Sequence, residues 1–121
     1  MSMNYTNTFS NADVLKKHLA WGEKVESGVA KLAFKQRDRG QNRIIRVGYV
    51  SPDFRRHSVA YFIEPILSDH HRQQVNLFCY SIMPVNDEVT EKFKKSTDHW
   101  RDISRMTDSE AEERIRRDEI D

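Results

Sequence analysis

The chain has 121 residues, which is enough for one domain but too few for an enzyme with two complete lobes. Its 20 lysines and arginines nearly balance 19 aspartates and glutamates and are scattered among them, so the charge pattern does not favour a nucleic-acid partner. Cys79 is the single cysteine, which excludes an intrachain disulfide; with no apolar stretch typical of a signal peptide or membrane span, we expect a cytoplasmic protein without a membrane partner.

The N-terminal part of the chain is expected to be helical. Apolar residues recur at three- and four-residue steps across residues 11–34, and Asn11 is a possible cap. The polar stretch KQRDRGQNR follows without any periodicity, which indicates a solvated linker. We therefore divide the chain into a helical lead-in with its linker, residues 1–42, and a second segment, residues 43–121.

Three short segments of the second part have the composition of strands. Residues 44–50 (IIRVGYV) and residues 75–81 (VNLFCYS) are apolar almost throughout. This pattern predicts neighbouring central strands that are buried on both faces of a parallel sheet. Residues 99–104 (HWRDIS) form a weaker third candidate.

A helix is expected after each of these strands. Ser58 can cap the first helix, and Pro65 should kink that helix or restrict it to its first turns. Asn86 or Asp87 is placed to cap the second helix. The third helix begins with capping-box spacing, from Thr107 to a glutamate three residues later.

The alternation of strand and helix predicts an α/β fold. We expect a partial Rossmann-like parallel sheet with right-handed crossovers, preceded by the N-terminal helical segment. A fourth strand is expected to begin at Ile120, and since the sequence stops at Asp121, we expect the chain to be a truncated lobe.

The loop SPDFRRHS is the candidate site in this sequence. It follows the first expected strand, where open α/β sheets bind their ligands, and it leads into a helix N-terminus suited to an anion. A structural alternative stays open, in which the acid and the serine close the turn, the arginines are solvated and the histidine packs. The loop offers one carboxylate, two guanidinium groups, one imidazole and one hydroxyl, from Asp53, Arg55, Arg56, His57 and Ser58.

From Arg43 onward the chain resembles a known family. The segments RVGYVSPDFRRHSVAYFIEPIL, VNLFCYS and DHWRDIS, then an acidic-to-basic helix ending in RRDEID, are similar in order and spacing to the start of the catalytic region in protein O-linked N-acetylglucosamine transferases. The likeness is greatest to the bacterial, tetratricopeptide-linked, SPINDLY-like members. It covers most of residues 43–121 and includes the distinctive block YVSPDFRRHS.

This resemblance implies the N-terminal part of a two-lobed GT-B glycosyltransferase. Such an enzyme moves N-acetylglucosamine from UDP-GlcNAc to Ser or Thr of a protein acceptor, with inversion and without a metal or other cofactor. The chain would be inactive alone, because the missing C-terminal lobe carries the nucleotide-binding groups. His57 matches the active-site histidine of the family and is implied as a catalytic base, relay or positioning group. The weaker, substrate-binding candidates are Asp53, Arg55, Arg56 and Ser58.

Two other hypotheses are compatible with the sequence. The chain could be a small α/β binding or regulatory module that acts through protein contacts, or a partial reading frame without a function of its own. The remaining polar residues do not suggest a metal site: His70 and His71 are expected on the surface, Cys79 as a structural thiol, and Trp100 in the core.

Overall fold

The computed structural model describes residues 9–28, 40 and 43–121. It divides the chain into two compact units, Met1–Asp38 and Arg39–Asp121. Most of the expected linker lies outside the described residues, so our boundary between residues 42 and 43 stays a prediction. Within the described ranges, no helix is long and apolar enough to cross a membrane.

The first unit contains the helix α1 (Asn11–Glu26). Ser10 and not Asn11 is its N-cap: the Ser10 hydroxyl accepts from the N–H of Asp13 at 3.2 Å, and the Asp13 carboxylate accepts from the N–H of Ser10 at 3.2 Å. Our proposed Asn11 cap is therefore wrong by one residue, because this reciprocal capping box satisfies two free amides at once. The rest of the expected helix, residues 29–34, lies outside the described residues.

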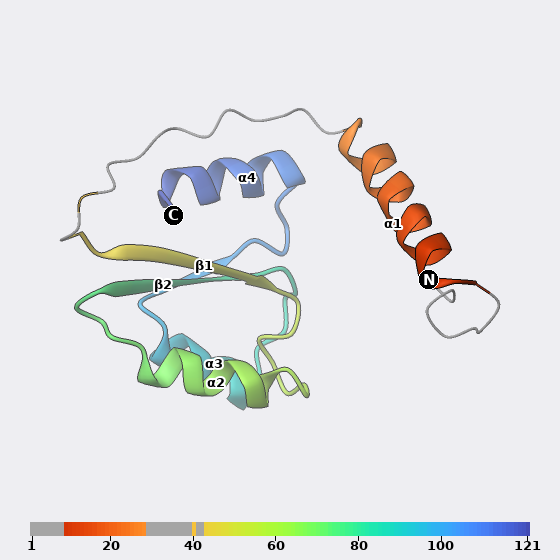
Figure 1. Ribbon diagram of the computed structural model, residues 1–121. Coiled ribbons are helices and arrows are strands. Elements are labelled where there is room, and N and C mark those ends of the chain that lie inside the picture. Colours follow the sequence, from red (N-terminus) through yellow and green to blue (C-terminus); the bar gives the residue numbers. More distant parts are fainter. Residues whose placement is uncertain (1–8, 29–39, 41–42) are drawn as a thin grey trace. The chain divides into compact units, whose positions relative to one another are not determined.

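The second unit is a three-stranded parallel sheet with helices on both faces (Figure 1). The strands β1 (Ile45–Ser51), β2 (Val75–Ser81) and β3 (His99–Asp102) lie in the order β1-β2-β3. The helices α2 (Ala60–Asp69) and α3 (Glu88–Ser96) cover one face, and α4 (Asp108–Arg117) covers the other. This arrangement confirms the predicted α/β fold, in which β1 and β2 are parallel neighbours.

Alternation along β2 builds two small cores. Leu77 and Cys79 point to the α2 and α3 face, where they join a buried cluster that includes Leu67 and Phe93. Phe78 and Tyr80 belong to a second cluster, which is packed by residues of α4 and of the segment after it. Because successive side chains of a strand alternate between faces, an apolar run on β2 can supply both cores.

β1 differs from its predicted role as a central strand. Among the described residues it is an edge of the sheet, with β2 on one side only. Ile45 and Val50 keep 47% and 54% of their surface exposed, so β1 is not buried on both faces. The apolar pattern therefore predicted the strand correctly but overestimated its burial.

The start of α2 also differs from the sequence prediction. Its N-cap is Val59, without a side-chain hydrogen bond, and Ser58 is exposed and does not cap the helix. The helix continues through Pro65 instead of stopping in its first turns. Pro65 is exposed, so water can bond the Tyr61 carbonyl that loses its helical partner there.

The other two helices begin where the sequence predicted. Asp87 caps α3, and Thr107 forms a capping box with Glu110 at the start of α4. Each cap satisfies amides of the first turn that have no partner inside the helix. These caps position the two loops that follow β2 and β3.

One carboxylate, that of Asp98, joins α2, β2 and the start of β3 at the amino end of the strands. It accepts hydrogen bonds from the Leu77 N–H at 2.8 Å and from His70 Nε2 at 2.9 Å, and it pairs with Arg72. The His70 side chain is only 6% exposed, so our expectation of a surface histidine is wrong, whereas His71 is exposed as expected. The hydrogen bond to Asp98 offsets the cost of burying the ring.

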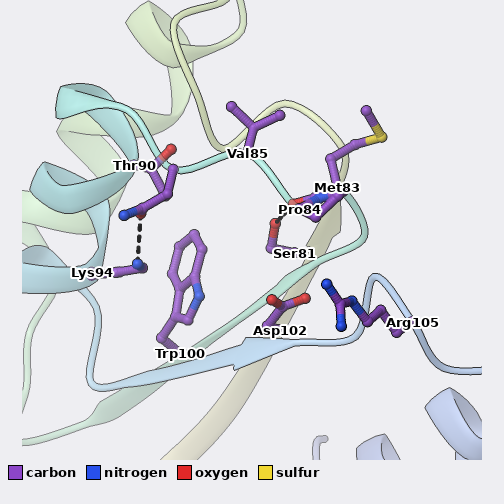
Figure 2. A pocket seen from close by; sticks show the side chains of 10 residues that line it. Ser81, Met83, Pro84, Val85, Thr90, Lys94, Trp100, Asp102 and Arg105 are labelled. Atoms are coloured by element: carbon purple, nitrogen blue, oxygen red, sulfur yellow. Dashed lines mark hydrogen bonds between the residues drawn. The ribbon is translucent and has the colours of Figure 1, made fainter.

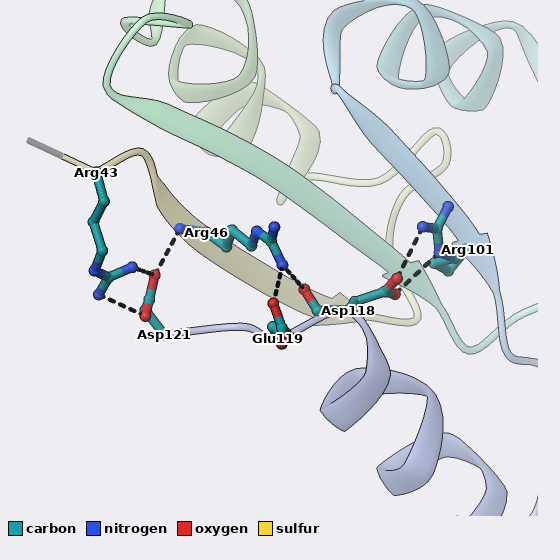
Figure 3. A network of polar contacts seen from close by, with 6 residues as sticks. All are labelled: Arg43, Arg46, Arg101, Asp118, Glu119 and Asp121. Atoms are coloured by element: carbon teal, nitrogen blue, oxygen red, sulfur yellow. Dashed lines mark hydrogen bonds and ion pairs between the residues drawn. The ribbon is translucent and has the colours of Figure 1, made fainter. Parts of the chain in front are cut away.

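A second carboxylate, that of Asp118, fastens α4 to the sheet (Figure 3). It accepts from the Tyr80 hydroxyl at 2.9 Å and from two nitrogens of Arg101, at 2.9 and 3.0 Å. Partial burial acts to raise the pKa of Asp118, but the bonds from Arg101 and Tyr80 and the charge of Arg114 hold it below its ordinary value. The folded protein therefore favours the ionised form of Asp118.

We predict that Asp98 makes this fold sensitive to acid. Partial burial acts to raise its pKa, but the Leu77 N–H, His70 and Arg72 lower it below the ordinary 3.8. A depressed pKa contributes stability above the unfolded value that is lost as the pH falls through the folded value. Asp98→Asn should therefore reduce the free energy of unfolding at neutral pH by about 1–3 kcal/mol and flatten its fall in acid.

Urea unfolding of the wild type and of Asp98→Asn across the acid range measures both effects. Asp69→Asn is the matched control, because Asp69 is exposed and lies outside this cluster. An Asp98→Asn curve with the wild-type dependence on pH, or a loss no greater than that of the control, would contradict the prediction.

Candidate functional site

The loop between β1 and α2 lies at the carboxyl edge of the sheet. Its first turn is closed by the Ser51 hydroxyl, which accepts from the Asp53 N–H at 3.0 Å. Phe54, only 3% exposed, anchors the loop in the core, where its ring lies 6.1 Å from that of Phe93 and 5.5 Å from that of Trp100. The loop is therefore mounted on the core while its polar side chains stay at the surface.

His57 is the partly exposed imidazole of this loop. Its Nδ1 accepts a hydrogen bond from the Val59 N–H at 3.2 Å, and it lies 3.7 Å from a carboxylate oxygen of Asp53. The side chain is 37% exposed, and Nε2 has no hydrogen-bond partner in the described part of the chain. Because Nδ1 accepts from an amide, the proton of the neutral ring is on Nε2, which can donate outward.

Two more of the predicted residues lie beside this imidazole. The Asp53 carboxylate pairs with Arg55 Nη2 at 3.2 Å, and their side chains are 22% and 35% exposed. The Nε atom of Arg55 is buried and has no partner in the described residues. Asp53, Arg55 and His57 therefore form one polar group at the mouth of the loop.

The two remaining candidates do not join that group. The side chain of Arg56 pairs with Glu88 at the surface and is 74% exposed. Ser58 is exposed, and its carbonyl accepts from the Tyr61 N–H at 3.3 Å as part of the turn into α2. Their geometry matches the structural alternative that the sequence left open for these two positions.

Asp87 is a residue whose second role the sequence did not reveal. One of its oxygens caps α3, and the other accepts from the Arg56 backbone N–H at 2.7 Å. The bonds from the Arg56 amide and then from Thr90 hold the pKa of Asp87 below its ordinary value. The sequence predicted the capping position of Asp87 from its place before a helix. It could not predict the bond to Arg56, because the two residues are 31 positions apart.

A pocket of about 410 Å³ lies beside the loop, at the carboxyl ends of β2 and β3 (Figure 2). Ser81 and Asp102 end the two strands, and Trp100, which the sequence placed simply in the core, forms part of the wall. Thr90 joins the pocket to the loop, since its hydroxyl donates to the Phe54 carbonyl at 2.8 Å. Volumes of this order suit small ligands or single peptide side chains with their backbone.

Neither a metal site nor a nucleophilic thiol is found in the described residues. No group of three or more histidine, cysteine, aspartate or glutamate residues there could hold a metal ion. Cys79 is buried, and this burial raises the pKa of its thiol to about 11. At neutral pH the thiol is therefore protonated, which agrees with the structural role expected for it.

Comparison with known proteins gives one consistent family. The sequence profile of glycosyl transferase family 41 matches residues 9–121. Over 125 aligned residues the chain is 30% identical to a probable UDP-N-acetylglucosamine–peptide N-acetylglucosaminyltransferase, SPINDLY, of Solanum lycopersicum. This alignment covers 100% of this chain and 13% of that protein. It is 34% identical over 79 residues to the Caenorhabditis elegans UDP-N-acetylglucosamine–peptide N-acetylglucosaminyltransferase, covering 63% of this chain and 7% of that protein.

A solved structure agrees with these sequence matches. A mutant O-GlcNAc transferase of Thermobaculum terrenum superposes with a TM-score of 0.85 and 32% sequence identity. The match covers 97% of this chain and 22% of that chain. The chain thus spans a small part of the length of the relatives that it matches.

We predict that the His57 imidazole, and not Ser58, holds the Val59 N–H just before α2. His57→Ala removes the acceptor of the Val59 N–H, so amide exchange at Val59 should accelerate about fivefold, as loss of one hydrogen bond worth about 1 kcal/mol implies. Ser58→Ala is the matched control and should leave that rate unchanged. Hydrogen exchange followed by NMR measures both; equal acceleration in the two variants, or none in His57→Ala, would contradict the geometry.

Proposed function

The chain belongs to glycosyl transferase family 41, and from this premise we propose that it forms the first part of a protein O-GlcNAc transferase catalytic region. The complete enzyme would transfer N-acetylglucosamine from UDP-GlcNAc to Ser or Thr of a protein acceptor, with inversion at the sugar. The relatives are named as UDP-N-acetylglucosamine–peptide N-acetylglucosaminyltransferases, which supports this substrate pair. The observation that carries the proposal is the polar group of Asp53, Arg55 and His57 at the carboxyl edge of the sheet.

The open edge of β1 supports the proposal that the catalytic lobe continues. The Arg46 N–H donates to the Asp121 carboxylate at 2.9 Å (Figure 3). The Asp121 N–H donates to the Arg46 carbonyl, also at 2.9 Å. Ile45 and Ser51 bond toward the β2 side, so by alternation Gly48 and Val50 direct their backbone groups the same way as Arg46. We propose that a further parallel strand runs along this edge.

The packing of Ile120 fits such a strand. A Cβ atom at Gly48 would come within 3.1 Å of Ile120 Cγ2, so a larger residue there would force the Ile120 side chain to shift by a few tenths of an ångström. Ile120 also packs against the core under α4. With the nucleotide-binding groups proposed for a second lobe, the 121-residue chain by itself is expected to be inactive.

His57 is proposed to act as a hydrogen-bond donor in this enzyme. In an inverting transfer, the acceptor oxygen bonds to the anomeric carbon as the bond to the diphosphate breaks, and the hydroxyl proton passes to a base. Because Nδ1 is occupied by the Val59 N–H, the outward Nε2–H can donate to a substrate oxygen but cannot accept that proton. The base is therefore proposed to lie outside the described residues, and His57 positions or stabilises a substrate oxygen.

We predict that a chimaera can test this role. Residues 9–121 would replace the matching segment of the Thermobaculum terrenum transferase, and transfer of N-acetylglucosamine to a protein acceptor would be measured by mass spectrometry. His57→Ala should lower turnover by about 10²-fold or more. His57→Gln retains an N–H donor and should lose no more than about tenfold.

His71→Ala is the control for this experiment, because that histidine is exposed in a turn at the other end of α2. Thermal melting of each chimaera establishes that it is folded. Unchanged turnover in His57→Ala would remove His57 from the site. Equal losses in His57→Ala and His57→Gln would contradict the donor role alone.

A further inference from the structure

The pocket beside the loop has a wall suited to an apolar side chain. The Trp100 ring lies 5.5 Å from the Phe54 ring, and the Lys94 ammonium lies over it, 5.7 Å from the ring centre. Met83 and Val85 line the pocket and are 41% and 39% exposed. Exposed apolar side chains that line a pocket together with an aromatic ring are typical of a surface that a partner covers.

The other end of the pocket offers one charge of each sign (Figure 2). The Asp102 carboxylate is exposed and accepts from the Ser104 N–H at 3.0 Å, and the Ser104 side chain and backbone and the charge of Arg105 lower its pKa. Arg105 is also exposed and makes no ion pair within 4.0 Å in the part of the chain that the structure describes. Asp102 can therefore accept an amide N–H, while Arg105 can bind a carbonyl or a carboxylate.

Lys94 adds little to this recognition. Its ammonium donates to the Asn86 side-chain oxygen at 2.7 Å and to Glu91 at 2.8 Å. A free phosphate would meet the Asp102 charge, and a sugar ring stacked on Trp100 would have to share the ring with the Lys94 ammonium that lies over it. Among these ligand classes, an extended peptide uses the donor, the acceptor and the apolar wall together.

We propose that this pocket binds a polypeptide segment of the acceptor, next to the serine or threonine that receives the sugar, with an acidic side chain directed to Arg105. This inference rests on the proposed function. The pocket and the His57 loop share a wall, because Thr90 bonds to the Phe54 carbonyl and Phe54 packs on Trp100. A peptide that presents its hydroxyl to the loop can thus continue into the pocket.

The test uses the ¹⁵N-labelled chain and two libraries of blocked pentapeptides. Both have serine at the centre and random flanks, with glutamate after the serine in one library and lysine in the other. The glutamate library should shift the Trp100 indole N–H signal. Arg105→Glu should reduce the affinity for the glutamate library about fivefold and raise the affinity for the lysine library, because the substitution reverses the charge that faces the peptide side chain.

Arg116→Glu is the matched control, since Arg116 is exposed on α4, outside the pocket, and carries the same charge. No shift at Trp100 with either library, or shifts that do not respond to Arg105→Glu, would overturn the proposal. So would N-acetylglucosamine alone, or inorganic phosphate alone, producing the same shift, since either result would assign the pocket to a sugar or an anion.

Failure of this inference can be distinguished from failure of the proposed function. In the active chimaera, Arg105→Glu should raise the KM for an acceptor peptide with glutamate after serine and leave the KM for UDP-GlcNAc unchanged. An active chimaera with an unchanged peptide KM contradicts the pocket only. An inactive chimaera, while peptides still shift Trp100 in the isolated chain, contradicts the transferase function only.

Discussion

The candidate site depends on the carboxylate of Asp87. One oxygen accepts from the N–H groups of Val89 at 3.0 Å and Thr90 at 2.9 Å, so it starts α3. The other accepts from the Arg56 N–H at 2.7 Å, so it fixes the loop one residue before His57. A single side chain therefore sets the loop after β1 relative to the helix after β2, and it does so at the edge where α/β sheets bind ligands.

The candidate site and the Asp98 cluster lie at opposite ends of the strands in this unit. Asp98 joins α2, β2 and the start of β3 at the amino end of the strands, where it contributes to folding. At the carboxyl end, the loop of His57 and the pocket of Trp100 keep polar groups at the surface while Phe54 anchors them. Substitutions at the surface of the carboxyl edge are thus expected to leave the two cores intact.

The sequence predicted elements and family better than it predicted contacts. The strand at residues 75–81 and the capping box at Thr107 were found at the predicted positions, because local periodicity and spacing encode them. Ser58 was wrong as a cap because α2 begins at Ala60 with Val59 as its N-cap, and its first amides bond to backbone carbonyls, which spacing does not predict. The pocket is lined by residues from the ends of separate strands, such as Ser81 and Asp102, so no local sequence motif predicts it.

The most direct test of this account is a double-mutant cycle between Asp87 and His57 in the chimaeric transferase. Asp87 is a positioning residue that acts through the loop, so Asp87→Ala should lower kcat, and the double variant should be no worse than His57→Ala alone. This non-additivity at saturating acceptor is the predicted result. Fully additive losses, or wild-type kcat in Asp87→Ala, would show that the carboxylate does not work through His57 and would contradict the account.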